Sequence, residues 1–100
     1  MDRHIELGGQ EISLRYTVNA MCAVEDRAGG ALERLTDRQF TATRLLLWGG
    51  MFSERPDTTL QEAGEIISRH MEQGGSLDEI VDVCAMAMRD AGFFHRAAEA

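Results

Sequence analysis

Hydrophobic and polar residues alternate along the first part of the chain, residues 4–16. Residues 4–7 and 11–16 both follow the two-residue period of a β-strand. Between them, Gly8-Gly9-Gln10 supplies the positive φ angles that a tight turn requires. The pattern predicts a β-hairpin, and because a hairpin is not stable alone, its apolar face should pack on helices. That face should carry Ile5, Leu7, Ile12, Leu14 and Tyr16.

After Tyr16 the hydrophobic positions take up the period of helices. Thr17 is a candidate N-cap for a short helix that the glycine pair 29–30 ends. We expect this helix to bury one side that carries Val18, Met21 and Cys22. Residues 31–35 fit a further helical turn or two.

Three capping boxes mark three more helix starts, at Thr36, Thr59 and Ser76, each followed three residues later by Gln or Glu. Apolar residues surround most of the first of these helices, which predicts a central, buried helix with Trp48 in the core. They are Phe40, Leu45, Leu46, Leu47, Trp48, Met51 and Phe52. Its Gly49-Gly50 pair either admits a neighbouring backbone closely or ends the helix early.

The last two capping boxes precede amphipathic helices, which end near Gly74-Gly75 and near Gly92. The first has a core stripe of Leu60, Ala63, Gly64, Ile67 and Met71, and the second has Leu77, Ile80, Val81, Cys84 and Met88. The predicted fold is therefore mainly α (α+β), with about four helices in a small bundle and an N-terminal β-hairpin. We expect one domain over 1–100, with the hairpin at 4–16 and the helical part at 17–92. The pattern assigns no regular structure to the tail at 93–100.

Charge and hydropathy narrow the choice of partners. The net charge is -7, and the ten basic residues, all arginine, are scattered along the chain. Nucleic-acid binding normally requires a basic patch, so we expect no nucleic-acid partner. No apolar run approaches the roughly 18 residues that cross a bilayer, and the N-terminus lacks the pattern of a secretory signal. We therefore expect a cytoplasmic protein without a membrane partner.

Candidate chemistry is sparse. The histidines, at positions 4, 70 and 95, lack the spacing of metal ligands, and the glycine pairs do not form a phosphate-binding loop. Cys22 and Cys84 both fall on predicted buried faces, where thiols are usually inert. We expect no catalytic residue, metal or cofactor, and hence no enzyme.

One feature favours binding to another protein. Met86 points about 180° away from Leu77, among Asp82, Arg89 and Asp90, so the core stripe of its helix does not explain it. Methionine adapts to irregular partners and is common on binding surfaces. The candidate partner-binding residues are Val83, Met86, Phe93 and Phe94.

The order of these motifs resembles a known family. A hairpin ends in Ile12-Ser13-Leu14-Arg15-Tyr16, an acidic pair precedes Gly29, and two apolar segments, 45–50 and 59–64, follow before a final amphipathic helix. Over roughly residues 5–92 the chain is similar to the tail assembly chaperone-like proteins of tailed phages. It is most similar to the small tail assembly protein of bacterial gene transfer agents, which is sometimes labelled a tail tube protein.

The resemblance implies a function in binding. Members of this family coat the long tape measure protein during tail assembly, help to recruit tail tube protein, and are absent from the finished particle. The partners implied for this chain are the tape measure protein and the tail tube protein, in the cytoplasm of a bacterial host, and a homo-oligomer stays open. Two other classes stay open, namely a structural tube or connector component of the particle and a small acidic helical regulator.

Overall fold

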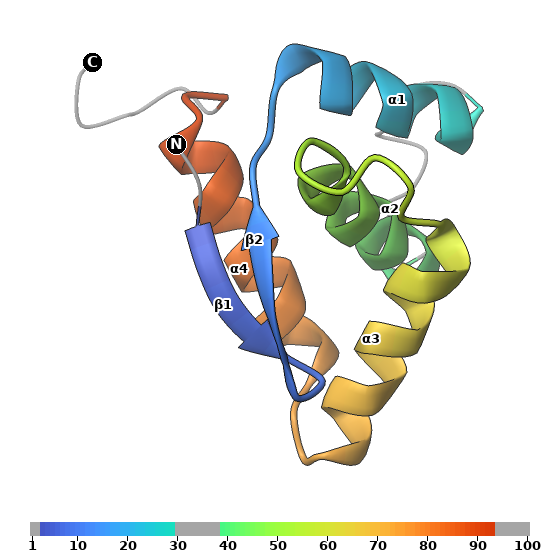
Figure 1. Ribbon diagram of the computed structural model, residues 1–100, viewed down its shortest axis with the longest axis vertical. Coiled ribbons are helices and arrows are strands. Elements are labelled where there is room, and N and C mark those ends of the chain that lie inside the picture. Colours follow the sequence, from blue (N-terminus) through green and yellow to red (C-terminus); the bar gives the residue numbers. More distant parts are fainter. Residues whose placement is uncertain (1–2, 30–38, 94–100) are drawn as a thin grey trace.

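The computed structural model of the protein describes residues 3–29 and 39–93 (Figure 1). Two short strands come first and helices follow, so the predicted mainly α fold with an N-terminal hairpin is confirmed. In chain order the elements are β1 (Arg3–Leu7), β2 (Gln10–Leu14), α1 (Val18–Ala28), α2 (Gln39–Phe52), α3 (Leu60–Glu72) and α4 (Leu77–Asp90). The helical turn expected at 31–35 and the capping box at Thr36 lie outside the described residues.

The hairpin pairs β1 and β2 antiparallel, residue for residue, around a turn of Gly8 and Gly9. Both turn glycines have positive φ, 59° and 82°, which side chains disfavour. Gln10 pairs with Leu7, so it belongs to the strand and not to the predicted turn. The register places Ile5 opposite Ile12 on the side that faces the helices, as expected.

The helix ends follow the predicted caps. The Thr17 hydroxyl accepts a hydrogen bond from the Ala20 N–H at 3.0 Å, and Gly29 ends α1 in the left-handed conformation, φ 77°. Both halves of the capping box are present at Thr59 and at Ser76. These local interactions satisfy backbone groups that a helix terminus leaves open, so they fix where α3 and α4 begin.

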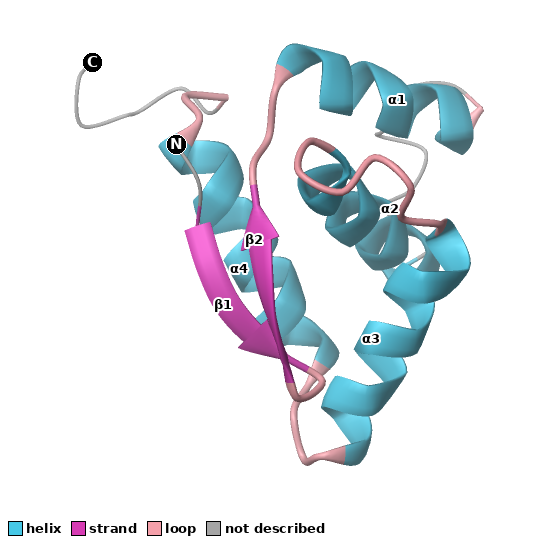
Figure 2. Cartoon of the chain, in the orientation of Figure 1, coloured by secondary structure: helices cyan, strands magenta, loops and turns pink. Residues whose placement is uncertain are grey.

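Helix α2 is the centre of the molecule. It packs against α1, α3, α4 and β2, and the helices form most of the described structure, with the hairpin along one side (Figure 2). Trp48 is 3% exposed and donates a hydrogen bond from Nε1 to the Thr58 carbonyl at 2.8 Å. The Arg27 guanidinium of α1 lies 5.0 Å from the centre of the same ring. The predicted burial of Trp48 is confirmed. Its ring joins α2 to α1, through Arg27, and to the loop before α3, through Thr58.

The glycine pair in α2 marks a close approach, and the helix continues beyond it to Phe52. A Cβ at Gly49 would lie 2.5 Å from Val24 Cγ2, and a Cβ at Gly50 would lie 2.8 Å from Leu14 Cδ2 and 2.9 Å from the Tyr16 ring. Any side chain here would push α1 and the end of the hairpin away from α2. The glycine pair therefore admits a close neighbour and does not end the helix early.

Helix α1 buries a different side from the predicted one. Val18 is 70% exposed and Cys22 is exposed, so their predicted burial is wrong; Met21 is half-buried against the core. The buried residues are Ala20 and Val24. The reason is the glycine at position 49, because an added Cβ there would lie 2.5 Å from Val24 Cγ2 and 3.9 Å from the Ala20 carbonyl oxygen.

Two other predicted core residues lie at the surface. Met71 is 40% exposed, because the hairpin turn rests on the neighbouring side of α3, where a Cβ at Gly8 would lie 3.0 Å from the Ile66 carbonyl. Ile66 is therefore buried together with Ile67. Phe40, in the first turn of α2, is 66% exposed, although it was expected among the core residues. Both side chains lie near a helix end, where few other described elements reach them.

The close approach at Gly50 predicts the effect of adding one methyl group. Gly50→Ala should lower the free energy of unfolding by about 1–3 kcal/mol, because the buried Cβ meets Leu14 and Tyr16 at distances too short for contact. Chemical denaturation followed by circular dichroism measures this change.

Gly64→Ala is the matched control. Gly64 is also inside a helix, but its Cβ would meet only the flexible Arg44 side chain, at 3.3 Å. This variant should be neutral or gain up to about 1 kcal/mol from helix propensity. Equal effects of the two substitutions would contradict the close packing of α2 at Gly50.

Candidate partner-binding surface on α4

Helix α4 presents one side to the core and another to solvent. Its buried residues recur at helical spacing and are Leu77, Ile80, Cys84, Ala87 and Met88. Cys84 is fully buried, as predicted. Val81, which was expected in the same stripe, is half-buried at its margin. The capping box at Ser76 fixes where the helix begins, and therefore which side of it faces outward.

The solvent side of α4 carries an isolated apolar side chain among charges. Met86 is 42% exposed, as the sequence predicted. Asp82 and Asp90 lie one helical turn before and after it, and both are exposed. Arg89 is also exposed on this side. Asp90 forms an ion pair with Arg3 of β1, at 2.8 Å between Arg3 Nη2 and Asp90 Oδ2. We call this solvent side, made by Asp78, Asp82, Met86, Arg89 and Asp90, the α4 outer face.

The other three residues of the predicted site are placed differently. Val83 lies at the margin of the α4 outer face, half-buried and packed against the core. Phe93 is also half-buried against the core, and Phe94 lies outside the described residues. Within the described residues, Met86 is therefore the member of the predicted site whose side chain is most available to a partner.

A helix-ending motif accounts for the position of Phe93. Gly92 has φ 85°, its N–H donates to the Arg89 carbonyl at 2.9 Å, and the Phe93 N–H donates to the Met88 carbonyl at 3.1 Å. This is the Schellman arrangement, in which the residue after the glycine commonly makes an apolar contact with the helix it closes. Phe93 thus packs within its own chain.

Sequence reasoning did not identify three further exposed apolar side chains. Val18, Phe40 and Met71 lie on α1, α2 and α3 and are each at least 40% exposed. The hydrophobic period had placed all three in the core. The period shows that a helix has an apolar side but does not show which of two candidate sides meets a neighbour.

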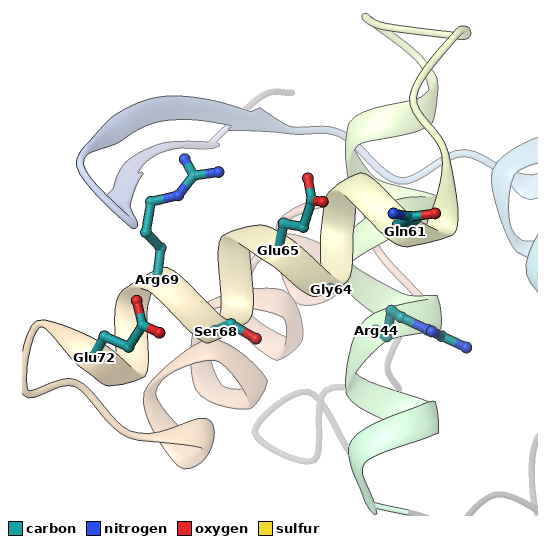
Figure 3. Close-up of a pocket in the computed structure, with 7 residues that line it drawn as sticks. All are labelled: Arg44, Gln61, Gly64, Glu65, Ser68, Arg69 and Glu72. Carbon is teal, nitrogen blue, oxygen red and sulfur yellow. The ribbon is translucent and has the colours of Figure 1, made fainter.

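One surface depression among the described residues is lined mainly by charged and polar side chains. It lies along α3 next to Arg44 of α2, and its lining carries both charge signs (Figure 3). In Figure 3 the Arg44 and Arg69 side chains point in different directions, and the carboxylates of Glu65 and Glu72 do not converge on a common point. The remaining lining residues are Gln61, Gly64 and Ser68.

A polar contact between His70 and Glu79 joins the end of α3 to the start of α4. His70 Nε2 lies 3.1 Å from Glu79 Oε1, and the same carboxylate accepts the Ser76 N–H at 2.7 Å. The Ser76 hydrogen bond, followed by that of His70, lowers the pKa of Glu79. A Cβ at Gly75 would lie 2.2 Å from His70 Nε2, so glycine is required for this arrangement. His70 therefore has a structural role at the end of α3.

The two thiols have opposite environments. Cys84 is buried beside the Tyr16 phenol, and burial raises the pKa of Cys84 to about 11. Burial also raises the pKa of Tyr16, whose hydroxyl donates to the Leu46 carbonyl. Cys22 is exposed on α1. Since the thiolate is the reactive form, Cys84 is unreactive in the folded protein.

Residues 3–29 and 39–93 contain neither a candidate metal site nor a candidate membrane span. Three or more His, Cys, Asp or Glu side chains do not gather anywhere in this part of the chain in a way that could hold a metal ion. Among the helices of the same part, none has both the length and the apolar character that crossing a bilayer requires.

The thiol environments predict the outcome of a titration with Ellman's reagent. At pH 8 the native protein should release about one equivalent of thionitrobenzoate quickly, from Cys22, because Cys84 is buried and protonated. In denaturant both thiols should react. A Cys22→Ser variant should lose the fast reaction, and rapid labelling of Cys84 in that variant would show that the core around Tyr16 is open.

No family model, no curated protein and no solved structure matches the chain.

Proposed function

We propose that this protein is a non-enzymatic tail assembly chaperone of a tailed phage or gene transfer agent. In this proposal it binds the tape measure protein in the cytoplasm of the bacterial host and assists assembly of the tail tube. It would leave before the particle is complete. The observation that carries the proposal is the ordered set of motifs from the hairpin to the last amphipathic helix, residues 5–92.

The properties of the α4 outer face support this proposal. A tape measure protein is long and helical, and its apolar stripes are exposed until a tube surrounds them. A helix that lays its apolar side against an apolar anchor is a common way to cover such a stripe. Met86 offers an adaptable anchor that is 42% exposed, and Val83 extends the apolar strip toward the core.

Charge also fits reversible binding. The exposed carboxylates of Asp78 and Asp82 lie on the same side as Met86, whereas Asp90 is paired with Arg3 and Arg89 carries the opposite charge. Like charges on neighbouring copies would discourage contact through this side of the molecule, whereas a partner helix with basic residues would be attracted to it. The chain could then bind an apolar stripe without aggregating through the same surface.

The alternative of a tube subunit finds less support. Tube subunits require long strands, and the strands of the described residues are both five residues long. A small acidic regulator would share the negative charge, but it would not depend on a tape measure protein.

Co-expression with the tape measure protein tests the proposal. The wild-type chain should raise the amount of soluble tape measure protein and co-purify with it. Met86→Asp should reduce both yields several-fold, because it places a further carboxylate where the apolar anchor lies. Its melting temperature should change little, since the side chain is at the surface.

Met71→Asp is the matched control, because Met71 is a helical methionine of almost the same exposure, 40% against 42%. It should retain the wild-type yield. If both variants retain it, the α4 outer face is not the binding surface. If the wild-type chain does not co-purify with any tape measure fragment, the chaperone proposal is wrong.

A further inference from the structure

The outer edge of β1 carries backbone hydrogen-bonding groups that no other described residue uses. In a hairpin with a two-residue turn, Leu7 and Gln10 form the first hydrogen-bonded pair, and pairs then alternate along the ladder. Ile5 and Arg3 therefore direct their N–H and C=O groups toward β2, whereas His4 and Glu6 direct theirs away from it. Among the described residues, none bonds to the outward groups of His4 and Glu6.

The opposite edge of the hairpin confirms this alternation. Glu11 and Ser13 of β2 direct their N–H and C=O groups away from β1. Arg15, two residues after Ser13, should direct its N–H the same way. The Arg15 N–H indeed donates to the Gly50 carbonyl of α2 at 2.8 Å. The β2 edge thus faces α2, and the β1 edge lies on the other side of the hairpin, away from α2 (Figure 1).

Three of the features that prevent edge pairing are missing from β1. Natural edge strands are commonly blunted by proline, by lysine or by a bulge, and also by shortness and by charge; β1 is five residues long and carries Arg3 and Glu6. Arg3–Leu7 contains no proline, the chain contains no lysine, and the pairing with β2 is residue for residue without a bulge.

We propose that β1 is a self-association edge, on which two copies of this chain pair their β1 strands antiparallel about a two-fold axis at Ile5. The two hairpins then form one continuous sheet. In this register His4 of each copy lies opposite Glu6 of the other, and both have outward backbone groups, so each such pair exchanges two N–H···O bonds.

Charge selects this register. Within one hairpin Glu6 lies directly opposite Glu11, and like charges so placed are destabilising. Pairing about Ile5 places His4 of the second copy on the other side of Glu6, on the same solvent face. The His4 imidazole can donate a hydrogen bond to the Glu6 carboxylate. This contact offsets the repulsion between Glu6 and Glu11, which nothing offsets within a single hairpin.

The apolar face of the hairpin is also incomplete on this side. Ile12 is 2% exposed, but Ile5, its partner in the ladder, remains only half-buried. At the two-fold axis Ile5 meets Ile5 of the second copy in a closely spaced, non-hydrogen-bonded pair. The side chain that the helices leave partly uncovered thereby gains a cover.

This inference does not depend on the identity of the chaperone's partner, because it concerns the chain alone. A dimer built on β1 leaves Met86 outside the strand pairing. It would double the number of α4 outer faces that one assembly presents to a long partner. If the chain does not dimerise, the proposal of tape measure binding is unaffected. If the chain does not bind the tape measure protein, the proposal of dimerisation is unaffected.

Sedimentation equilibrium of the purified chain tests the proposal, over about 1 µM to 1 mM. The wild type should dimerise reversibly. Glu6→Pro should raise the dimer dissociation constant about tenfold or more, because proline removes an outward N–H while the ladder to β2 stays intact. Glu11→Pro is the matched control, since it removes the corresponding outward N–H on the other edge, and it should dimerise as the wild type does.

A charge exchange and a cross-link provide readouts that do not depend on proline. His4→Glu should weaken the dimer, and His4→Glu combined with Glu6→Arg should restore it. In a Cys22→Ser background, Ile5→Cys should form an intermolecular disulfide on mild oxidation, whereas Glu11→Cys should not. A wild type that stays monomeric throughout, or a dimer that survives Glu6→Pro and dissociates with Glu11→Pro, would overturn the proposal.

Discussion

The close contact of α2 with the end of the hairpin is the constraint on which the rest of the structure depends. Because positions 49 and 50 lack side chains, Val24 and the Tyr16 ring approach the α2 backbone directly. Two hydrogen bonds then fix the contact, from the Tyr16 hydroxyl to the Leu46 carbonyl and from the Arg15 N–H to the Gly50 carbonyl. A short α1 and a two-stranded hairpin have little stability alone, so their attachment to α2 makes one core.

This attachment also determines what remains for other molecules. The hairpin uses its β2 edge and apolar face within the chain, and among residues 3–29 and 39–93 nothing pairs with the outer edge of β1. Helix α4 uses the side that carries Ile80 and Cys84, which leaves Met86 and its acidic neighbours in solvent. The surfaces proposed for self-association and for partner binding are thus the sides that the α2-centred core does not use.

Much of this fold could be predicted from local sequence, because caps and turns depend on neighbouring residues. The capping boxes at Thr59 and Ser76, the turn at Gly8 and the outward direction of Met86 are of this kind. Cys22 and Met71 were misplaced, because their burial depends on which side of a helix meets a distant element. Glycine at position 49 selects the Ala20 side of α1, and the hairpin turn selects the Ile66 side of α3; neither contact is local in sequence. Phe93, from the predicted site, is a different case, because a local motif that ends the helix at Gly92 turns its ring toward the core.

In the function that we propose, the chain acts on the tape measure protein during assembly and is not a part of the particle. The most direct measurement is quantitative mass spectrometry of the chain in two samples from one producing culture, tape measure complexes isolated when the tube protein is absent and purified finished particles. The account predicts that the chain is abundant in the first sample and missing from the second, while the tape measure protein is present in both. A chain that is retained in the finished particle in many copies would contradict the chaperone function and identify a structural component.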